Sequence, residues 1–269
     1  MASILIIWHK DVEKVLLLNK EVHTMKKNIT VTIILALIIG SSAHASHHGG
    51  AHKYDKKPKI IISDNEYLTN INLMKGHLWV GFELYKVSNL DNAKKHMKHP
   101  KSELYGGMVP TFEAKGAPGF ASELESLASS VENEEPLKTI HNHYQILFKA
   151  INNNEKFISE SSDSINKKIE LVISLLQIAA DEYAVGIVNG KVENKYEYQD
   201  ALGFTTMAKN ILEDITTEKV TEKERLSKII GILDTLASLW PELVPSLNVN
   251  ADAKTILDAI VEIKKYSSI

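Results

Sequence analysis

Apolar residues recur at intervals of three and four from Asp64 onward, a spacing that places them on one face of an α-helix. The first such stretch carries Leu68, Ile71, Met74 and Leu78 and predicts a long helix with one buried face. Further helices are predicted from Asn89 or Asp91 through Met97, from Pro118, from Pro136, over Ile165–Val188, from Asn194, over Val220–Leu239 and over Ala253–Tyr266.

Proline, glycine and short polar residues mark where these helices begin and end. Pro100 disfavours helical geometry at the residue before it, so the second helix is expected to end there. The stretch Gly106–Pro118 is rich in glycine and proline and predicts a loop-rich connection. Ser164 and Asn194 predict helix N-caps, and Glu197 three residues after Asn194 completes a capping-box pattern.

The predicted fold is an all-α helical bundle. The polar run between Asn152 and Ser164 indicates a linker, which divides the chain into an N-terminal helical subdomain, residues 64–155, and a C-terminal one, residues 162–269. Two helical subdomains packed side by side are therefore expected. Strand-like sequence is confined to Ile60–Ile62.

The N-terminal region has the three-part pattern of a secretory signal. Lys26 and Lys27 follow Met25, an apolar run extends over Ile29–Ile39, and small residues end at Ala45. This predicts that residues 1–45 are an upstream extension plus signal peptide, with the true start at Met25 and cleavage after Ala45. The alternative is an uncleaved membrane anchor, although the apolar run is short for a membrane span.

The composition of the mature chain limits its function. Removing five basic and three acidic residues with the first 45 shifts the net charge from −3 to −5, which argues against nucleic-acid binding. The absence of cysteine excludes disulfides, thiolate metal sites and haem of c type. Residues 46–63 predict a flexible His-rich tail, and the mature chain is expected to lack a membrane span.

Histidine is the main chemical signal in the mature chain. His96 and His99 are three residues apart, so their rings lie on one side of a helical turn and can bind one divalent cation. His77 in the first helix is the expected third nitrogen, and Glu103 can supply an oxygen. Alternatively, His96 and His99 only complement the negative end of the helix dipole, beside Lys94, Lys95 and Lys98 on a solvated basic face.

A second group of candidates is acidic and aromatic. Glu182 and Tyr183 near the end of one helix face Glu197 and Tyr198 at the start of the next, with Asp181 and Asp200 beside them. Carboxylates and phenols suit ferric iron, so these four residues are secondary metal candidates. The alternative is that the tyrosines pack between the helices while the acids cap them or face solvent.

The stretch LLQIAADEYAVGIVNGKVENKYEYQDALGF, Leu175–Phe204, resembles the extracytoplasmic helical domain of some bacterial high-affinity iron permease family proteins. The resemblance rests on the acid-tyrosine pairs, the turn at Val188, Gly190 and Val192, and the Glu-Tyr start of the following helix. It implies metal handling outside the cytoplasm. The membrane helices and Arg-Glu-x-x-Glu motif of those permeases are missing from this chain, so the resemblance does not imply transport itself.

Motifs of metalloproteases, di-iron bundles and phosphate-binding loops are missing from the sequence. The serine-hydrolase fragments S-x-x-K, at Ser164–Lys167, and S-D-N, at Ser63–Asn65, occur in reversed order and without K-T-G, so the sequence favours a non-enzymatic protein. We expect an exported periplasmic protein that binds or delivers a metal ion, iron or copper, with a membrane permease or another envelope protein as partner. The alternative is a metal-free helical interaction module of the cell envelope, which binds a protein partner through the region Gly106–Gly119.

Overall fold

A computed structural model describes residues 63–249 and 251–267. The predicted signal peptide, nearly all of the His-rich tail and the strand candidate Ile60–Ile62 lie outside these residues.

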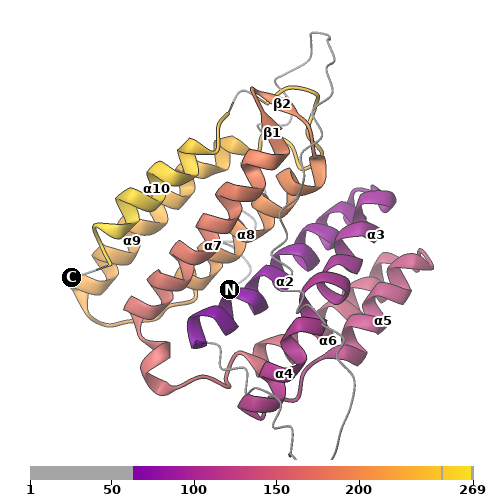
Figure 1. The fold of residues 1–269 in the computed structure, drawn as a ribbon, viewed down its shortest axis with the longest axis horizontal. Helices are drawn as coiled ribbons and strands as arrows, with labels where there is room; N and C mark the ends of the chain where they lie inside the picture. Colours follow the sequence, from indigo (N-terminus) through magenta and orange to yellow (C-terminus); the bar gives the residue numbers. More distant parts are fainter. Residues whose placement is uncertain (1–62, 250, 268–269) are drawn as a thin grey trace, which may run out of the picture.

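The predicted all-α helical bundle is confirmed (Figure 1). Its helices are α2 (Asp64–Lys86), α3 (Leu90–His99), α4 (Gly106–Lys115), α5 (Ala121–Glu132), α6 (Leu137–Asn154), α7 (Ile165–Gly186), α8 (Lys195–Glu213), α9 (Val220–Thr235) and α10 (Lys254–Lys264). The shorter helical turns are the π-helix η1 (Pro100–Tyr105) and the 3₁₀ turns η2 (Glu160–Asp163) and η3 (Leu236–Leu239).

The predicted N-caps are present. The Ser164 side chain accepts a hydrogen bond from the Lys167 amide, and the Asn194 side chain accepts one from the Tyr196 amide. Asn194 also donates from Nδ2 to Glu197 Oε1, 3.1 Å away, so the predicted capping-box partners are in contact through their side chains. These bonds satisfy amides that have no partner inside the first helical turn, and so fix where α7 and α8 begin.

The prediction of a loop-rich segment after Pro100 is wrong for Gly106–Lys115, which forms helix α4. Helix α3 ends at His99, as predicted from Pro100, but the chain does not leave helical geometry there. His99 keeps helical dihedrals, and Pro100 begins the π-helix η1, which continues the helical path although proline has no amide hydrogen to donate. The helical path ends at Gly116, whose left-handed φ of 70° is readily adopted by glycine.

A small β-hairpin between α7 and α8 was not predicted. Strands β1 (Ile187–Val188) and β2 (Lys191–Val192) pair antiparallel around Asn189 and Gly190, which have φ values of 51° and 74°. Two consecutive left-handed residues are typical of a tight hairpin turn, and Asn-Gly is its favoured sequence. Helix α7 therefore ends at Gly186, two residues before the predicted end.

Helix α2 lies between the two halves of the molecule (Figure 1). It packs against α3 and α6 on one side and against α7 and α8 on the other. Accordingly, its Tyr67 and Met74 belong to the buried cluster formed with α3–α6, whereas Leu73 belongs to the cluster formed by α7–α10. Across the described residues, none of the helices combines the length and apolar character that a membrane span requires.

Glycine allows α2 and α8 to approach closely. A Cβ atom added to Gly203 would lie 2.5 Å from the carbonyl oxygen of Gly76, and one added to Gly76 would lie 3.0 Å from the Gly203 backbone. No larger residue fits this crossing without moving a helix backbone. Because His77 follows Gly76 and Asp200 lies one turn before Gly203, the crossing also brings these two side chains together.

Candidate metal centre

Three imidazoles and one carboxylate meet where α2, α3 and α8 adjoin. His77 comes from α2, His96 and His99 from α3, and Asp200 from α8, and one ligand atom of each lies within 4.8 Å of all the others. The three histidines are those predicted from the sequence. Asp200, which the sequence placed only beside the acidic and aromatic group, is the residue on which they converge.

The Nδ1 atoms of all three histidines face Asp200. His77 Nδ1 lies 2.5 Å and His96 Nδ1 lies 2.9 Å from Asp200 Oδ1, while His99 Nδ1 lies 3.8 Å from Asp200 Oδ2. The first two contacts are hydrogen bonds in which Nδ1–H donates to the carboxylate. The third is too long for a hydrogen bond.

Burial and the neighbouring imidazoles have opposite effects on the ionisation of Asp200. His77, His96 and Asp200 are buried, and only the His99 side chain, 23% exposed, opens toward solvent. Burial by itself disfavours the charged form of Asp200, but the surrounding imidazoles outweigh it and hold the pKa of this carboxyl well below its usual range. Asp200 is therefore ionised at neutral pH and supplies one negative charge to the centre.

The pKa of His99 is raised above its ordinary value, chiefly by Asp200 and further by Glu103 and Glu197, against the opposing effect of burial. Its Nδ1 atom is buried and has no hydrogen-bond partner. A buried ring nitrogen without a partner is costly unless it is bound by something else, such as a metal ion. This atom is therefore free to act as a ligand.

The spacing of the four side chains suits a small cation. Metal–nitrogen and metal–oxygen bonds of 2.0–2.2 Å in a tetrahedral site place neighbouring ligand atoms about 3.4 Å apart. The three distances from a histidine Nδ1 to an Asp200 oxygen range from 2.5 to 3.8 Å, so some are shorter and one is longer than 3.4 Å. The ligand atoms, which all lie within 4.8 Å of one another, therefore have to move closer together to surround one ion.

Aromatic packing and helix geometry hold the rings in place. The edge of the Phe204 ring packs against the His77 ring, with 5.0 Å between centroids. His96 and His99 project from the same side of α3, as their spacing predicted, with ring centroids 5.7 Å apart. The centre is thus built on helices rather than on loops.

The structure places Glu103 at the rim. Its Oε1 atom lies 4.0 Å from His99 Nε2, and its side chain is more than half exposed. Glu103 is thus close to the exposed imidazole but outside the group whose ligand atoms gather around Asp200.

The secondary candidates occupy two different environments. Burial, together with the charges of Glu197, Asp200 and Asp181, raises the pKa of Glu182 to about 8. Tyr183 and Tyr198 instead use their hydroxyls to donate to the backbone carbonyls of Leu239 and Glu242, at 3.0 and 2.8 Å.

The remaining histidines of the described chain lie apart from this centre, on α6. The exposed His141 stacks on Phe82 with 5.5 Å between ring centroids, and His143 is half-buried two residues further on. The tail histidines His47, His48 and His52 lie outside the described residues.

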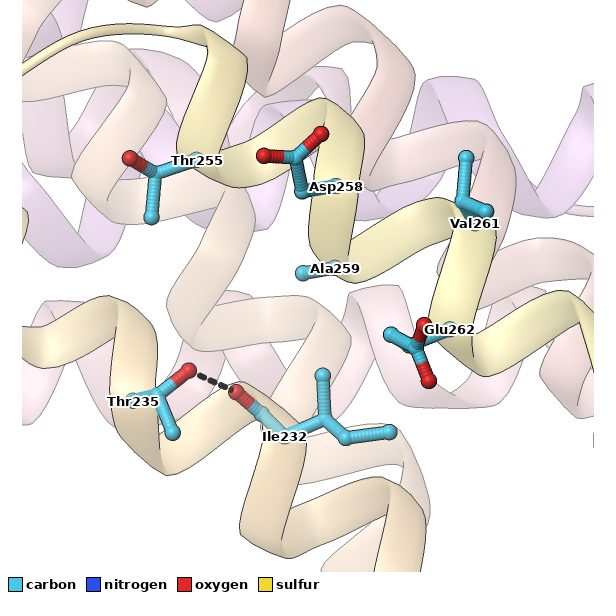
Figure 2. A pocket seen from close by; sticks show the side chains of 7 residues that line it. All are labelled: Ile232, Thr235, Thr255, Asp258, Ala259, Val261 and Glu262. Carbon is cyan, nitrogen blue, oxygen red and sulfur yellow. Dashed lines mark hydrogen bonds between the residues drawn. The ribbon is translucent and has the colours of Figure 1, made fainter.

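A surface pocket of about 450 Å³ between α9 and α10 contains none of these groups (Figure 2). Its lining residues are Ile232, Thr235, Thr255, Asp258, Ala259, Val261 and Glu262. Asp258 and Glu262 are paired with Lys254 and Lys265 of the same region, so the pocket holds no unpaired carboxylate. It has no metal-binding chemistry of its own.

Comparison with known families identifies the C-terminal half. Residues 159–268 match the iron permease-associated 4-helix bundle domain. The match contains the whole of Leu175–Phe204, so the predicted resemblance is confirmed, and it covers η2 and the four helices α7–α10. No curated protein and no solved structure gave a significant match.

This match divides the candidate metal centre between two parts of the chain. Asp200 belongs to the region similar to the iron permease-associated domain, whereas His77, His96 and His99 lie outside it. The similarity links the chain to iron permeases and metal transport. The histidines that complete the centre are supplied by α2 and α3, which pack onto that bundle.

Proposed function

We propose that this chain is an exported metal-binding or metal-delivery accessory protein whose ion, iron or copper, is held by His77, His96, His99 and Asp200. The observation that carries the proposal is the convergence of three imidazoles on one buried, ionised carboxylate. Carboxylates whose pKa is strongly shifted by specific charged partners in a buried setting are concentrated at functional sites.

The donor set favours a first-row transition metal. Imidazole nitrogen suits iron, copper, zinc and nickel, whereas calcium and magnesium prefer sites made only of oxygen. A single carboxylate balances half the charge of a divalent ion and leaves the bound centre cationic. The similarity of α7–α10 to an iron permease-associated domain favours iron among these metals.

The acidic residues near the exposed side give the ion a route to the centre. Glu103 lies beside His99, and Glu197 contributes negative potential near His99 and Asp200. Carboxylates around one opening raise the local concentration of cations. We propose that Glu103 takes part in ion entry or completes the coordination, with the Glu182–Glu197 pair as a secondary contact.

The secretory pattern at Met25–Ala45 supports export to the periplasm, and the iron permease-associated domain supports a permease as partner. In this proposal the boundary between an N-terminal and a C-terminal subdomain lies at residues 155–162, between α6 and α7. The ion then binds at the surface where the two subdomains meet, and their relative position governs its uptake and release.

Metal analysis of the mature chain, residues 46–269 without an affinity tag, tests this function. After exposure to ferrous iron or copper we expect one equivalent of ion per chain, which a His96→Ala, His99→Ala double variant fails to retain. A His141→Ala, His143→Ala variant is the matched control, because it removes two imidazoles from α6 and leaves the centre intact. Equal metal content in all three proteins would refute the proposal.

A further inference from the structure

His96 is held from both sides of its ring. Nδ1 lies 2.9 Å from Asp200 Oδ1, and Nε2 lies 2.9 Å from Gln199 Oε1. Both His96 and Gln199 are fully buried, so water does not compete for either nitrogen. The identity of the Gln199 atom that faces Nε2 therefore decides whether Nε2 donates or accepts a hydrogen bond.

The hydrogen bond made by the amide nitrogen of Gln199 fixes the orientation of the side-chain amide. Gln199 Nε2 lies 2.9 Å from the backbone carbonyl of Leu243, which can only accept a hydrogen bond. The amide nitrogen must therefore point to Leu243, and the amide oxygen must point to His96. Because that oxygen is only an acceptor, His96 Nε2 carries a hydrogen and donates it to Gln199.

The backbone that anchors Gln199 is itself held by buried side chains. Tyr183 donates to the Leu239 carbonyl and Tyr198 donates to the Glu242 carbonyl, while Trp240 Nε1 donates to the Tyr198 carbonyl at 2.8 Å. The segment 239–243 is thus tied to α7 and α8 by three hydrogen bonds. Gln199 is supported on a rigid backbone rather than on a free loop.

We infer that Gln199 is a positioning residue that keeps a hydrogen on His96 Nε2, so that an incoming ion displaces the hydrogen from Nδ1 and binds there. The inference rests on the proposed function and specifies how the ion is bound. A ligating histidine whose second nitrogen donates to a fixed acceptor has its tautomer and ring angle set by that acceptor. His77 and His99 also direct Nδ1 toward Asp200, so the centre binds through Nδ1 nitrogens throughout.

Nitrogen-15 NMR of the mature protein loaded with Zn²⁺, a diamagnetic probe, shows directly which His96 nitrogen carries a hydrogen and which binds the metal. The expected spectrum shows a His96 Nε2–H that exchanges slowly with water and a metal-shifted Nδ1. Coordination through His96 Nε2, with the hydrogen on Nδ1, would overturn the inference while leaving the metal site itself intact. Failure to bind Zn²⁺, iron or copper would overturn both this inference and the proposed function.

Two variants separate positioning from simple packing. Gln199→Met keeps the volume but removes the acceptor, and we expect a 10- to 100-fold weaker affinity for Zn²⁺, as is usual when the hydrogen-bond partner of a ligand is lost. Gln199→Glu retains an oxygen that accepts from Nε2–H, so the same NMR signature should persist. Identical His96 tautomers in wild type and Gln199→Met, with unchanged affinity, would also overturn the inference.

Discussion

His77 Nδ1 lies 2.5 Å from Asp200 Oδ1, although 123 residues separate the two along the chain. Their contact depends on the crossing of α2 and α8 at Gly76 and Gly203, where the two backbones are too close for any side chain. The chemistry of the centre therefore depends on the packing of two helices that belong to different halves of the molecule.

The first prediction concerns this crossing. A Gly203→Ala variant must push α2 away from α8, because the added Cβ would lie 2.5 Å from the Gly76 carbonyl oxygen. We expect a loss of about 1–3 kcal/mol in the free energy of unfolding, as for other overpacked sites, together with weaker metal binding. Denaturant unfolding and metal titration measure the two effects.

Gly231→Ala is the control for that substitution, because a Cβ added at Gly231 in the exposed part of α9 meets nothing within 4 Å. Replacing a helical glycine there should leave metal binding unchanged and raise stability by up to about 1 kcal/mol. Equal effects of the two substitutions would show that the crossing does not position the centre.

The second prediction concerns Asp200. Asp200→Asn keeps the shape of the side chain but removes the negative charge that balances the ion and strengthens the hydrogen bonds from two Nδ1–H groups. We expect the variant to lose bound ion and to unfold at a lower temperature than wild type even without metal. Calorimetry of the metal-free proteins measures the second effect, and an unchanged unfolding temperature would indicate that the carboxylate is not needed to organise the histidines.

The third prediction is a pH dependence at Glu182. Its pKa is raised to about 8 from the ordinary 4.5, so the folded protein binds a proton that the unfolded chain releases above pH 4.5. Stability must then decrease as the pH rises from about 4.5 toward 8, because the folded state holds more protons. Glu182→Gln removes this contribution, and its stability relative to wild type should be greater at pH 8 than at pH 5. Thermal unfolding at both pH values measures the difference, and a pH-independent difference would contradict the assignment.

The fourth prediction separates structural tyrosines from ligands. Tyr198 donates its hydroxyl to the Glu242 carbonyl, so Tyr198→Phe should cost about 0.5–1.5 kcal/mol of stability and leave the metal content unchanged. A visible iron–phenolate absorption band that disappears in this variant would instead make the phenol a ligand.

The sequence predicted most of this fold because helical spacing and N-cap residues are local signals. Ser164 and Asn194 cap the helices that they were expected to cap. The helix after Pro100 was missed because the π-helix η1 accommodates the proline. The hairpin at Asn189 and Gly190 was missed because its strands are only two residues long.

The candidate site was predicted in part for the same reason. His96 and His99 share a helical turn, so their proximity follows from spacing alone, and His77 could be selected as a histidine on a buried helix. The contribution of Asp200 could not be derived in this way, because it depends on how α8 crosses α2. The pair Gly76 and Gly203 was a signal of close helix packing, but the sequence does not indicate that the two glycines face each other.

Anomalous diffraction from crystals of the mature protein grown with ferrous iron tests the central claim most directly. The account predicts one strong peak about 2.0–2.2 Å from a nitrogen of each of His77, His96 and His99 and from a carboxylate oxygen of Asp200. A peak located elsewhere, or none at this position in crystals that contain bound iron, would contradict it.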